Sequence, residues 1–302
     1  MPSGRAAILL AALLWSSGGL FIKAAPLDGL QVVAGRAVVT VLFQLAVLRP
    51  DLRRARWASA VPYACMLVTY VTATKLTTAA NAIVLQYSGT AWLLLLAPRM
   101  LGEPVRRADL GVVALCLLGM GLCALDSPAA PALAETAWLG NLLAATSGVF
   151  YAIAILGMRR DTLEGRETAS TTLGNALAAM AAVALAPVLG TGAWSRVLEP
   201  VALGALLWLG VVQIGIAYLL FQRGLRTTPA ATAALLVLIE PVLSPAWVWL
   251  GTGEAPGAWS LAGGAVVLGA LAARELRALP APAQRVAAPD GAPPGSGASG
   301  VQ

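Results

Sequence analysis

The chain has 302 residues, of which 59% are hydrophobic and only 11% charged, and its mean hydropathy is +0.79. Soluble domains carry about 25% charged residues, so this composition excludes an ordinary soluble protein. The net charge is +6, but Lys and Arg lie mostly in short loops between apolar runs. A basic patch with interleaved aromatic residues is missing, which argues against a nucleic-acid partner. The expected partner is a lipid bilayer.

In chain order, apolar runs separated by Pro, Gly or charged residues predict ten membrane-spanning helices. Their expected ranges are 6–24, 29–48, 58–76, 79–100, 107–125, 136–157, 168–190, 200–221, 229–250 and 256–276. Each is close to the 20 or so apolar residues that one crossing requires. Lys23 disrupts the most natural site for signal-peptide cleavage, after Ala25, so we predict an uncleaved first helix. Residues 278–302 are rich in Pro, Gly, Ala and Ser and predict a disordered cytoplasmic tail.

The distribution of Lys and Arg predicts how these helices cross the membrane. Sixteen of the twenty lie in alternate loops or at the two ends of the chain, against three in the other set of loops. Loops rich in Lys and Arg face the cytoplasm. We therefore expect a multi-pass protein of the cell (inner) membrane with both termini in the cytoplasm.

The chain also contains a weak internal repeat. Residues 93–111 align with 243–262, and residues 32–39 align with 171–178. Each half has five predicted helices, an odd number, so the second half enters the membrane from the opposite side. The predicted fold is an all-α integral membrane protein of two inverted five-helix repeats, residues 5–125 and 136–277. Such repeats are typical of secondary transporters, whose sites lie near the bilayer midplane between the repeats.

Several short motifs then resemble one family, the EamA branch of the drug/metabolite transporter superfamily. They are the LLW run at residues 13–15, Gly102-Glu103, Glu240-Pro241 and Gly251 to Glu254. The resemblance covers residues 5–277. It implies a helical bundle with a central cavity and efflux or exchange of small metabolites or amphiphilic compounds, amino acids being a frequent substrate class. Gly89-Thr90 stands where relatives often have a proline, so the two halves are expected to break their helices differently.

Glu240 lies near the centre of the predicted helix 229–250, in the apolar stretch LLVLIEPVLSPAW. An ionisable group at that depth is costly and usually faces the bundle interior or a hydrated cavity. Pro241 and Pro245 each remove a helical hydrogen bond and predict a broken helix at the midplane. Two interpretations stay open. Glu240 binds a cationic group or a proton of the transport cycle, or it is a structural clamp to Arg36 or a neighbouring amide.

Other polar side chains inside the predicted spans need partners there and are expected to face the interior. The candidate cavity residues are Trp15, Tyr70, Asn81, Gln86, Tyr87, Tyr151, Gln213 and Tyr218. The resemblance favours Trp15 and Tyr87, because helices one and four line the cavity in that family. Arg36 is expected to be structural, and Lys23 and Lys75 to be interfacial anchors. Glu103 and Glu254 are expected to be exposed caps or loop partners.

The sequence argues against the other classes of function. It contains no histidine, its three cysteines lie inside apolar runs, and no pair of acids falls within a span. These features argue against an enzyme and against a metal or other cofactor. With no phosphate-binding loop, ATP is not expected to drive transport.

We predict a secondary transporter of small metabolites, an exporter or exchanger, with protons as a possible coupling ion. Alternatives are a carrier of drugs, nucleotide sugars or phosphorylated metabolites and, more remotely, an intramembrane enzyme. A monomer is expected, with a homodimer as the alternative.

Overall fold

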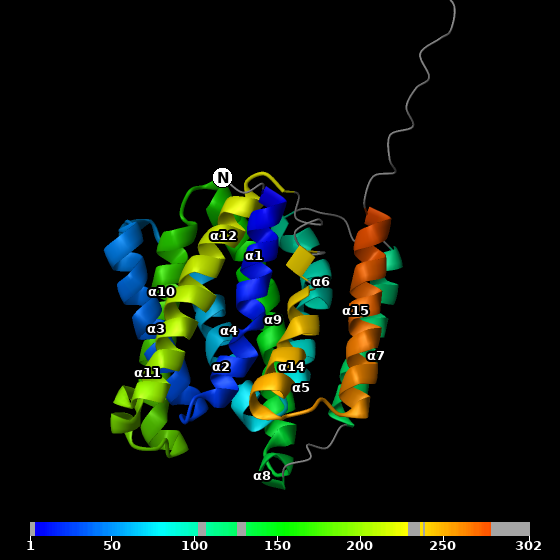
Figure 1. The fold of residues 1–302 in the computed structure, drawn as a ribbon. Coiled ribbons are helices and arrows are strands. Elements are labelled where there is room, and N and C mark those ends of the chain that lie inside the picture. Colours follow the sequence, from blue (N-terminus) through cyan, green and yellow to red (C-terminus); the bar gives the residue numbers. More distant parts are fainter. Residues whose placement is uncertain (1–3, 102–106, 126–130, 229–235, 238, 279–302) are drawn as a thin grey trace, which may run out of the picture.

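The computed structural model describes residues 4–101, 107–125, 131–228, 236–237 and 239–278. Within these ranges the chain is helical and contains no strand, and the helices stand side by side as a bundle (Figure 1). Five described helical stretches are long and apolar enough to cross a membrane: Gly4–Ala24, Gly29–Leu48, Ala137–Thr162, Thr168–Leu189 and Pro200–Leu225. The all-α membrane class is therefore confirmed, whereas the count of ten crossings stays a prediction. The predicted tail lies outside the described residues.

The helices of the first half follow the predicted ranges closely. They are α1 (Gly4–Ser16), α2 (Gly18–Ala24), α3 (Gly29–Phe43), the π-helical η1 (Gln44–Leu48), the 3-10 turn η2 (Leu52–Arg54), α4 (Trp57–Leu76), α5 (Ala79–Tyr87), α6 (Gly89–Leu101) and α7 (Arg107–Ala124). The repeat boundaries proposed from the sequence stay a prediction.

The second half begins with α8 (Pro131–Ala134), a single turn. It continues with α9 (Ala137–Leu163), α10 (Glu167–Leu189), the 3-10 turn η3 (Trp194–Leu198), α11 (Pro200–Leu207), the π-helical η4 (Trp208–Ile216), α12 (Ala217–Leu225), α14 (Ile239–Thr252) and α15 (Ala258–Ala278). The largest difference from the prediction is α9, expected to end at residue 157. It continues to Leu163 because its last turns pair with charged residues of neighbouring helices.

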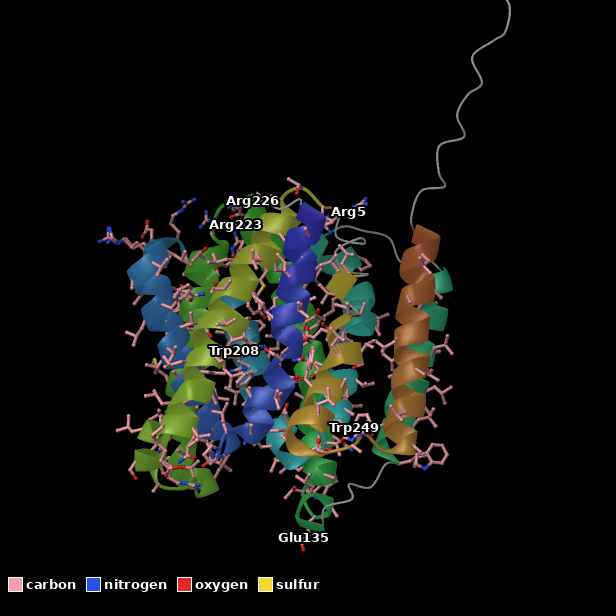
Figure 2. All side chains as sticks on the ribbon, in the orientation of Figure 1. Arg5, Glu135, Trp208, Arg223, Arg226 and Trp249 are labelled. Carbon is pink, nitrogen blue, oxygen red and sulfur yellow. The ribbon has the colours of Figure 1, made fainter. Side chains whose placement is uncertain are left out.

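The two halves enter the bundle from opposite ends. In Figure 1, α1 starts beside the N-terminus, whereas α9 starts at the opposite end, next to α8. The described chain finishes with α15 at the end of the bundle where it began. Figure 2 shows Arg5, Arg223 and Arg226 at that same end and Glu135 at the other. The arrangement is the one that an inverted repeat requires, and we call the Arg-rich end the predicted cytoplasmic end.

Two helices expected to be continuous are broken. The first ends at Ser16 and resumes at Gly18, and the fourth ends at Tyr87 and resumes at Gly89. At each break a serine hydroxyl donates to the preceding turn, from Ser17 Oγ to the Leu14 carbonyl at 2.7 Å and from Ser88 Oγ to the Leu85 carbonyl at 2.5 Å. Such local hydrogen bonds compete with helical ones and bend helices.

Tertiary contacts hold both breaks in place. Trp247 Nε1 donates to Ser16 Oγ and Trp208 Nε1 donates to Ser17 Oγ, each at 3.0 Å. At the other break, a Cβ on Gly89 would collide with the carbonyl oxygen of Gly148 in α9. The second half of the chain therefore fixes where the first half bends, which no local pattern in the first half reveals.

Close packing through glycine also joins α7 to α15. A Cβ on Gly119 would lie 2.7 Å from the Gly263 carbonyl oxygen and 2.6 Å from Val267. Glycine therefore allows the two backbones to approach. A Cβ on Gly111 of α7 or on Gly269 of α15 would meet nothing within 4 Å. Those two glycines are not needed for helix contact.

An ionic cluster joins α4, α9 and α10 at the predicted cytoplasmic end. Arg56 contacts Glu164 at 2.6 Å and the buried Asp161 at 3.4 Å, and Arg166 contacts Glu164 at 2.8 Å. Partial desolvation opposes ionisation of Glu164, but the hydrogen bond from Arg56 and the charges of Arg56, Arg166 and Arg160 lower its pKa below the usual range. The cluster explains why α9 continues beyond its predicted end.

A second polar network connects helices at the opposite end of the bundle. Lys23 of α2 forms an ion pair with Glu254 at 2.7 Å and donates a hydrogen bond to the Thr77 carbonyl at 2.7 Å. The Lys23 side chain is only 9% exposed. The same Glu254 accepts from the Ala79 backbone N–H at 2.7 Å. We call this the Lys23–Glu254 latch. Lys23 was expected to be an interfacial anchor, and Glu254 an exposed cap or a loop partner. Their ion pair ties α2 to the start of α5 and to the loop before α15.

Candidate functional site

Helices from both halves surround a small cavity inside the bundle. Its volume is about 50 Å³, and its lining residues are Trp15, Arg36, Met66, Leu67, Tyr70, Gln86, Tyr87, Tyr151, Ile155, Gln213, Ile214, Tyr218 and Glu240. A space of that size holds a few water molecules. The first half contributes α1, α3, α4 and α5, and the second contributes α9, η4, α12 and α14.

Glu240 lies in the first turn of α14 and its side chain reaches the cavity. The residue is only 9% exposed, and its Oε2 accepts a hydrogen bond from the Tyr87 hydroxyl at 2.7 Å. This bond joins α14 of the second half to α5 of the first, and it explains how a carboxylate is tolerated among apolar residues.

The two prolines expected to break the helix lie in different positions. Pro241 follows Glu240 directly in the described part of α14 and is buried. Pro245 lies inside α14 and does not end it, because the helix continues to Thr252. Residues 229–235 and 238, which belong to the rest of the predicted helix, lie outside the described residues.

Arg36 is buried, only 2% exposed, and lines the same cavity as Glu240. The structural clamp considered from the sequence would pair these two residues. Among the described residues, no carboxylate lies within 4 Å of the Arg36 guanidinium, so the two charges are not ion-paired with each other. The phenolic residues Tyr70 and Tyr218 line the cavity together with Arg36.

Five of the other lining residues are aromatic. The ring of Trp15 packs against that of Tyr218 at 4.8 Å between centroids, with a tilted geometry. Tyr87 and Tyr151 pack at 5.7 Å. These contacts join α1 to α12 and α5 to α9, so the rings that line the cavity also connect the two halves.

Gln213 reaches the cavity from a π-helical segment. Nine consecutive residues, Trp208–Ile216, form η4. Segments of π-helix are rare in proteins, and those that occur are often found at functional sites. Thr40 of α3 donates to the Gly210 carbonyl of this segment at 2.9 Å. A Cβ on Gly210 would lie 2.8 Å from the Arg36 carbonyl oxygen, so α3 and η4 are in close contact.

Two polar atoms of cavity residues are buried without a hydrogen-bond partner among the described residues. They are Nε1 of Trp15 and Oε1 of Gln213, one a donor and the other an acceptor. A buried unpaired polar group costs about 1–3 kcal/mol. Such groups occur where a ligand or water completes the hydrogen bonding.

Asn81 is the one sequence candidate that does not line the cavity. Its side chain accepts from the Ser260 hydroxyl of α15 and donates to Asn141 of α9 at 3.4 Å. It therefore joins three helices near the latch end of the bundle. The sequence candidates Trp15, Tyr70, Gln86, Tyr87, Tyr151, Gln213, Tyr218 and Glu240 do meet at the cavity.

Sequence reasoning missed two kinds of lining residue. Met66, Leu67, Ile155 and Ile214 are apolar residues in apolar spans, so nothing in their composition separates a cavity wall from a lipid-facing surface. Arg36 was recognised but assigned a structural role. Its signal was present in the sequence, because a charge inside a span marks a functional site by default.

Comparison with known proteins agrees with this architecture. A family model described as "EamA-like transporter family" matches residues 2–125 and 138–273. One solved structure, described only as "Crystal structure of protein", has a TM-score of 0.59 and 21% sequence identity, covering 91% of this chain and 97% of the other. At that identity the likeness shows the fold alone. Comparison with curated proteins finds no match. The two matched segments span most of the chain, and the protein therefore belongs to the EamA-like transporter family.

Proposed function

We propose that the protein is a secondary transporter that moves small metabolites, amino acids or related amphiphilic compounds, through the cavity, as an exporter or exchanger. The observation that carries this proposal is the buried carboxylate of Glu240, which lies in a cavity lined by both halves. Sites between repeats are where alternating access places the substrate.

The chemistry of the wall supports an amine-bearing, partly apolar substrate. A carboxylate in a low-dielectric site attracts a cation strongly, and aromatic faces such as those of Trp15 and Tyr151 also attract cations. Met66, Leu67 and Ile155 offer apolar surface beside these groups. An amino acid or a related amphiphile presents both features.

Glu240 itself is proposed to receive the cationic group of the substrate, or a proton that is exchanged for it. The Tyr87 hydroxyl orients the carboxylate at 2.7 Å. A structural clamp remains the competing interpretation, and the hydrogen bond to Tyr87 is the contact through which it would act.

Counterflow in proteoliposomes tests the proposed substrate class. Radiolabelled amino acids, amines, nucleotide sugars, sugar phosphates and cationic drugs would be offered to vesicles preloaded with the same unlabelled compound. Protein-dependent uptake of amino acids or amphiphilic amines supports the proposal. Uptake restricted to drugs or phosphorylated compounds would favour the alternative carriers of this superfamily, and uptake of none would contradict a transporter of these classes.

The role of Glu240 is tested with the Glu240→Gln variant, which keeps the shape but removes the charge. We expect counterflow of the accepted substrate to fall by about tenfold or more, because a hydrogen bond to a charged group contributes roughly 1.5–3 kcal/mol. Folding and membrane abundance should be preserved. The matched control is Glu135→Gln, an exposed carboxylate at the end of the bundle (Figure 2). Equal counterflow in Glu240→Gln and wild type, at equal abundance, would contradict the role.

A further inference from the structure

We propose that the cavity contains an anion-binding subsite formed by the guanidinium of Arg36, which receives a carboxylate-type group of the transported molecule. The inference rests on the proposed function, in which this cavity is the substrate path. It narrows the substrate class to molecules that carry an anionic group as well as the cationic group received by Glu240.

The first argument is that Arg36 is a buried charge without a counter-charge. It is only 2% exposed, and no carboxylate of the described residues lies within 4 Å of its guanidinium. A buried charge is costly unless it is paired and hydrogen-bonded. The partly buried Lys23 and Arg56 each meet a carboxylate. Arg36 instead lines the cavity, where a ligand can supply the missing charge.

The second argument is that packing fixes the backbone of Arg36 against the cavity. The Arg36 carbonyl accepts a hydrogen bond from the Thr40 hydroxyl at 2.9 Å. Gly210 of η4 packs closely against the same carbonyl. A leucine side chain, Leu206, fills the space beside the neighbouring Gly35. A guanidinium held on a rigid helix presents a planar fork of N–H donors that matches a carboxylate.

The third argument is the placement of the two charges. Arg36 and Glu240 line one cavity from different halves of the chain without forming an ion pair. Tyr70 and Tyr218 line the same cavity beside these two charges. A ligand with a carboxylate and an amine can therefore contact both charges at once, which neither a simple amine nor a simple acid can do.

A purely structural role for Arg36 makes a different prediction. If the guanidinium only filled space inside the bundle, replacing it would lower stability but would not change how the protein discriminates between ligands by their charge. The experiment therefore compares ligands that differ in one charged group.

The binding measurement uses purified full-length protein in detergent and follows its thermal unfolding. Isobutyrate and isobutyramide are added to the protein in separate titrations at constant ionic strength. Isobutyramide has the same shape as isobutyrate and no charge. We expect isobutyrate to raise the Tm of wild type in a saturable way and isobutyramide not to. The Arg36→Gln variant should lose this response, and Gln222→Leu, which removes a buried amide outside the cavity, should keep it. The absence of a carboxylate-specific shift in wild type, or an equal shift in Arg36→Gln, would overturn the subsite.

The Arg36→Lys variant covers the case in which Arg36→Gln fails to fold. It retains the positive charge and loses the planar fork. The isobutyrate concentration at half-maximal shift should rise by about tenfold, equivalent to one 1.4 kcal/mol step in binding free energy. An unchanged midpoint would contradict the proposal.

The transport measurement separates this proposal from the proposed function. Counterflow of leucine is compared with that of leucinamide, which keeps the amine and lacks the carboxylate. In Arg36→Gln we expect leucine counterflow to fall by about tenfold relative to leucinamide. If wild type carries both compounds and the variant affects them equally, the subsite is wrong while the transporter stands. If wild type carries neither compound, the amino-acid proposal is contradicted. The isobutyrate titration then still tests whether Arg36 forms an anion-binding subsite.

Discussion

At the scale of single residues, the cavity depends on a few polar contacts that cross between the two halves. The Tyr87 hydroxyl bonds to Glu240, and the Trp208 and Trp247 indoles bond to the serines at the break in the first helix. The bilayer core offers no bulk water to replace such bonds. Their loss should therefore affect both stability and the geometry of the cavity.

The bond between Tyr87 and Glu240 should be measurable as an energetic coupling. We expect the free energies of unfolding of Tyr87→Phe and Glu240→Gln to be non-additive by about 1 kcal/mol, because Tyr87→Phe removes the donor of the bond and Glu240→Gln replaces its charged acceptor with a weaker, neutral one. Unfolding of the purified single and double variants would be followed in denaturant. In the matched control, Trp208→Phe combined with Glu240→Gln should be additive within roughly 0.5 kcal/mol. Additivity in both pairs would show that the Tyr87 bond does not hold the carboxylate.

At the scale of elements, the Lys23–Glu254 latch connects segments from both halves of the chain. The latch joins α2, the start of α5 and the loop before α15, three segments that must separate if the latch end of the bundle is to open. An ion pair that is largely buried and also bonded to backbone groups is a stronger connection than an exposed one.

Weakening the latch should expose residues beneath it. Thr74, fully buried in α4, lies one turn from the cavity residue Tyr70 and toward the latch. In a protein without native cysteines and with Thr74→Cys, we expect Glu254→Gln to raise the rate of labelling by a polar thiol reagent several-fold. The matched control is Glu199→Gln, which removes an exposed ion pair with Arg196 that joins no separate helices. Equal labelling in the two variants would mean that the latch does not limit access.

At the scale of the whole molecule, the distribution of charge predicts the orientation in the membrane. Arg5, Arg223 and Arg226 gather at one end of the bundle and Glu135 lies at the other (Figure 2). Transfer of that many cations across the bilayer during insertion would be costly. The Arg-rich end is therefore expected to stay in the cytoplasm.

Thiol labelling of whole cells tests this orientation. Single cysteines would replace Arg53, Arg159 and Arg223 at the predicted cytoplasmic end, and Glu135 and Ser195 at the opposite end, all of them exposed. In a background without Cys65, Cys116 and Cys123, an impermeant reagent should label only positions 135 and 195. Permeabilised cells should label all five. Labelling of positions 53, 159 or 223 in intact cells would reverse or invalidate the predicted topology.

The sequence by itself determined the membrane class, the approximate helix ranges and the family, because composition and apolar length report directly on the solvent around each segment. It also identified Glu240 and most of the aromatic wall, since a polar group inside a span must face protein or a cavity. The breaks at Ser17 and Ser88 depend on contacts with Trp208, Trp247 and Gly148, which lie far away in the chain. Only the tertiary structure placed Asn81 among helix ties, paired Lys23 with Glu254 and left Arg36 without a carboxylate among the described residues. Pairing of charges is decided by which helices pack together, and that information is non-local.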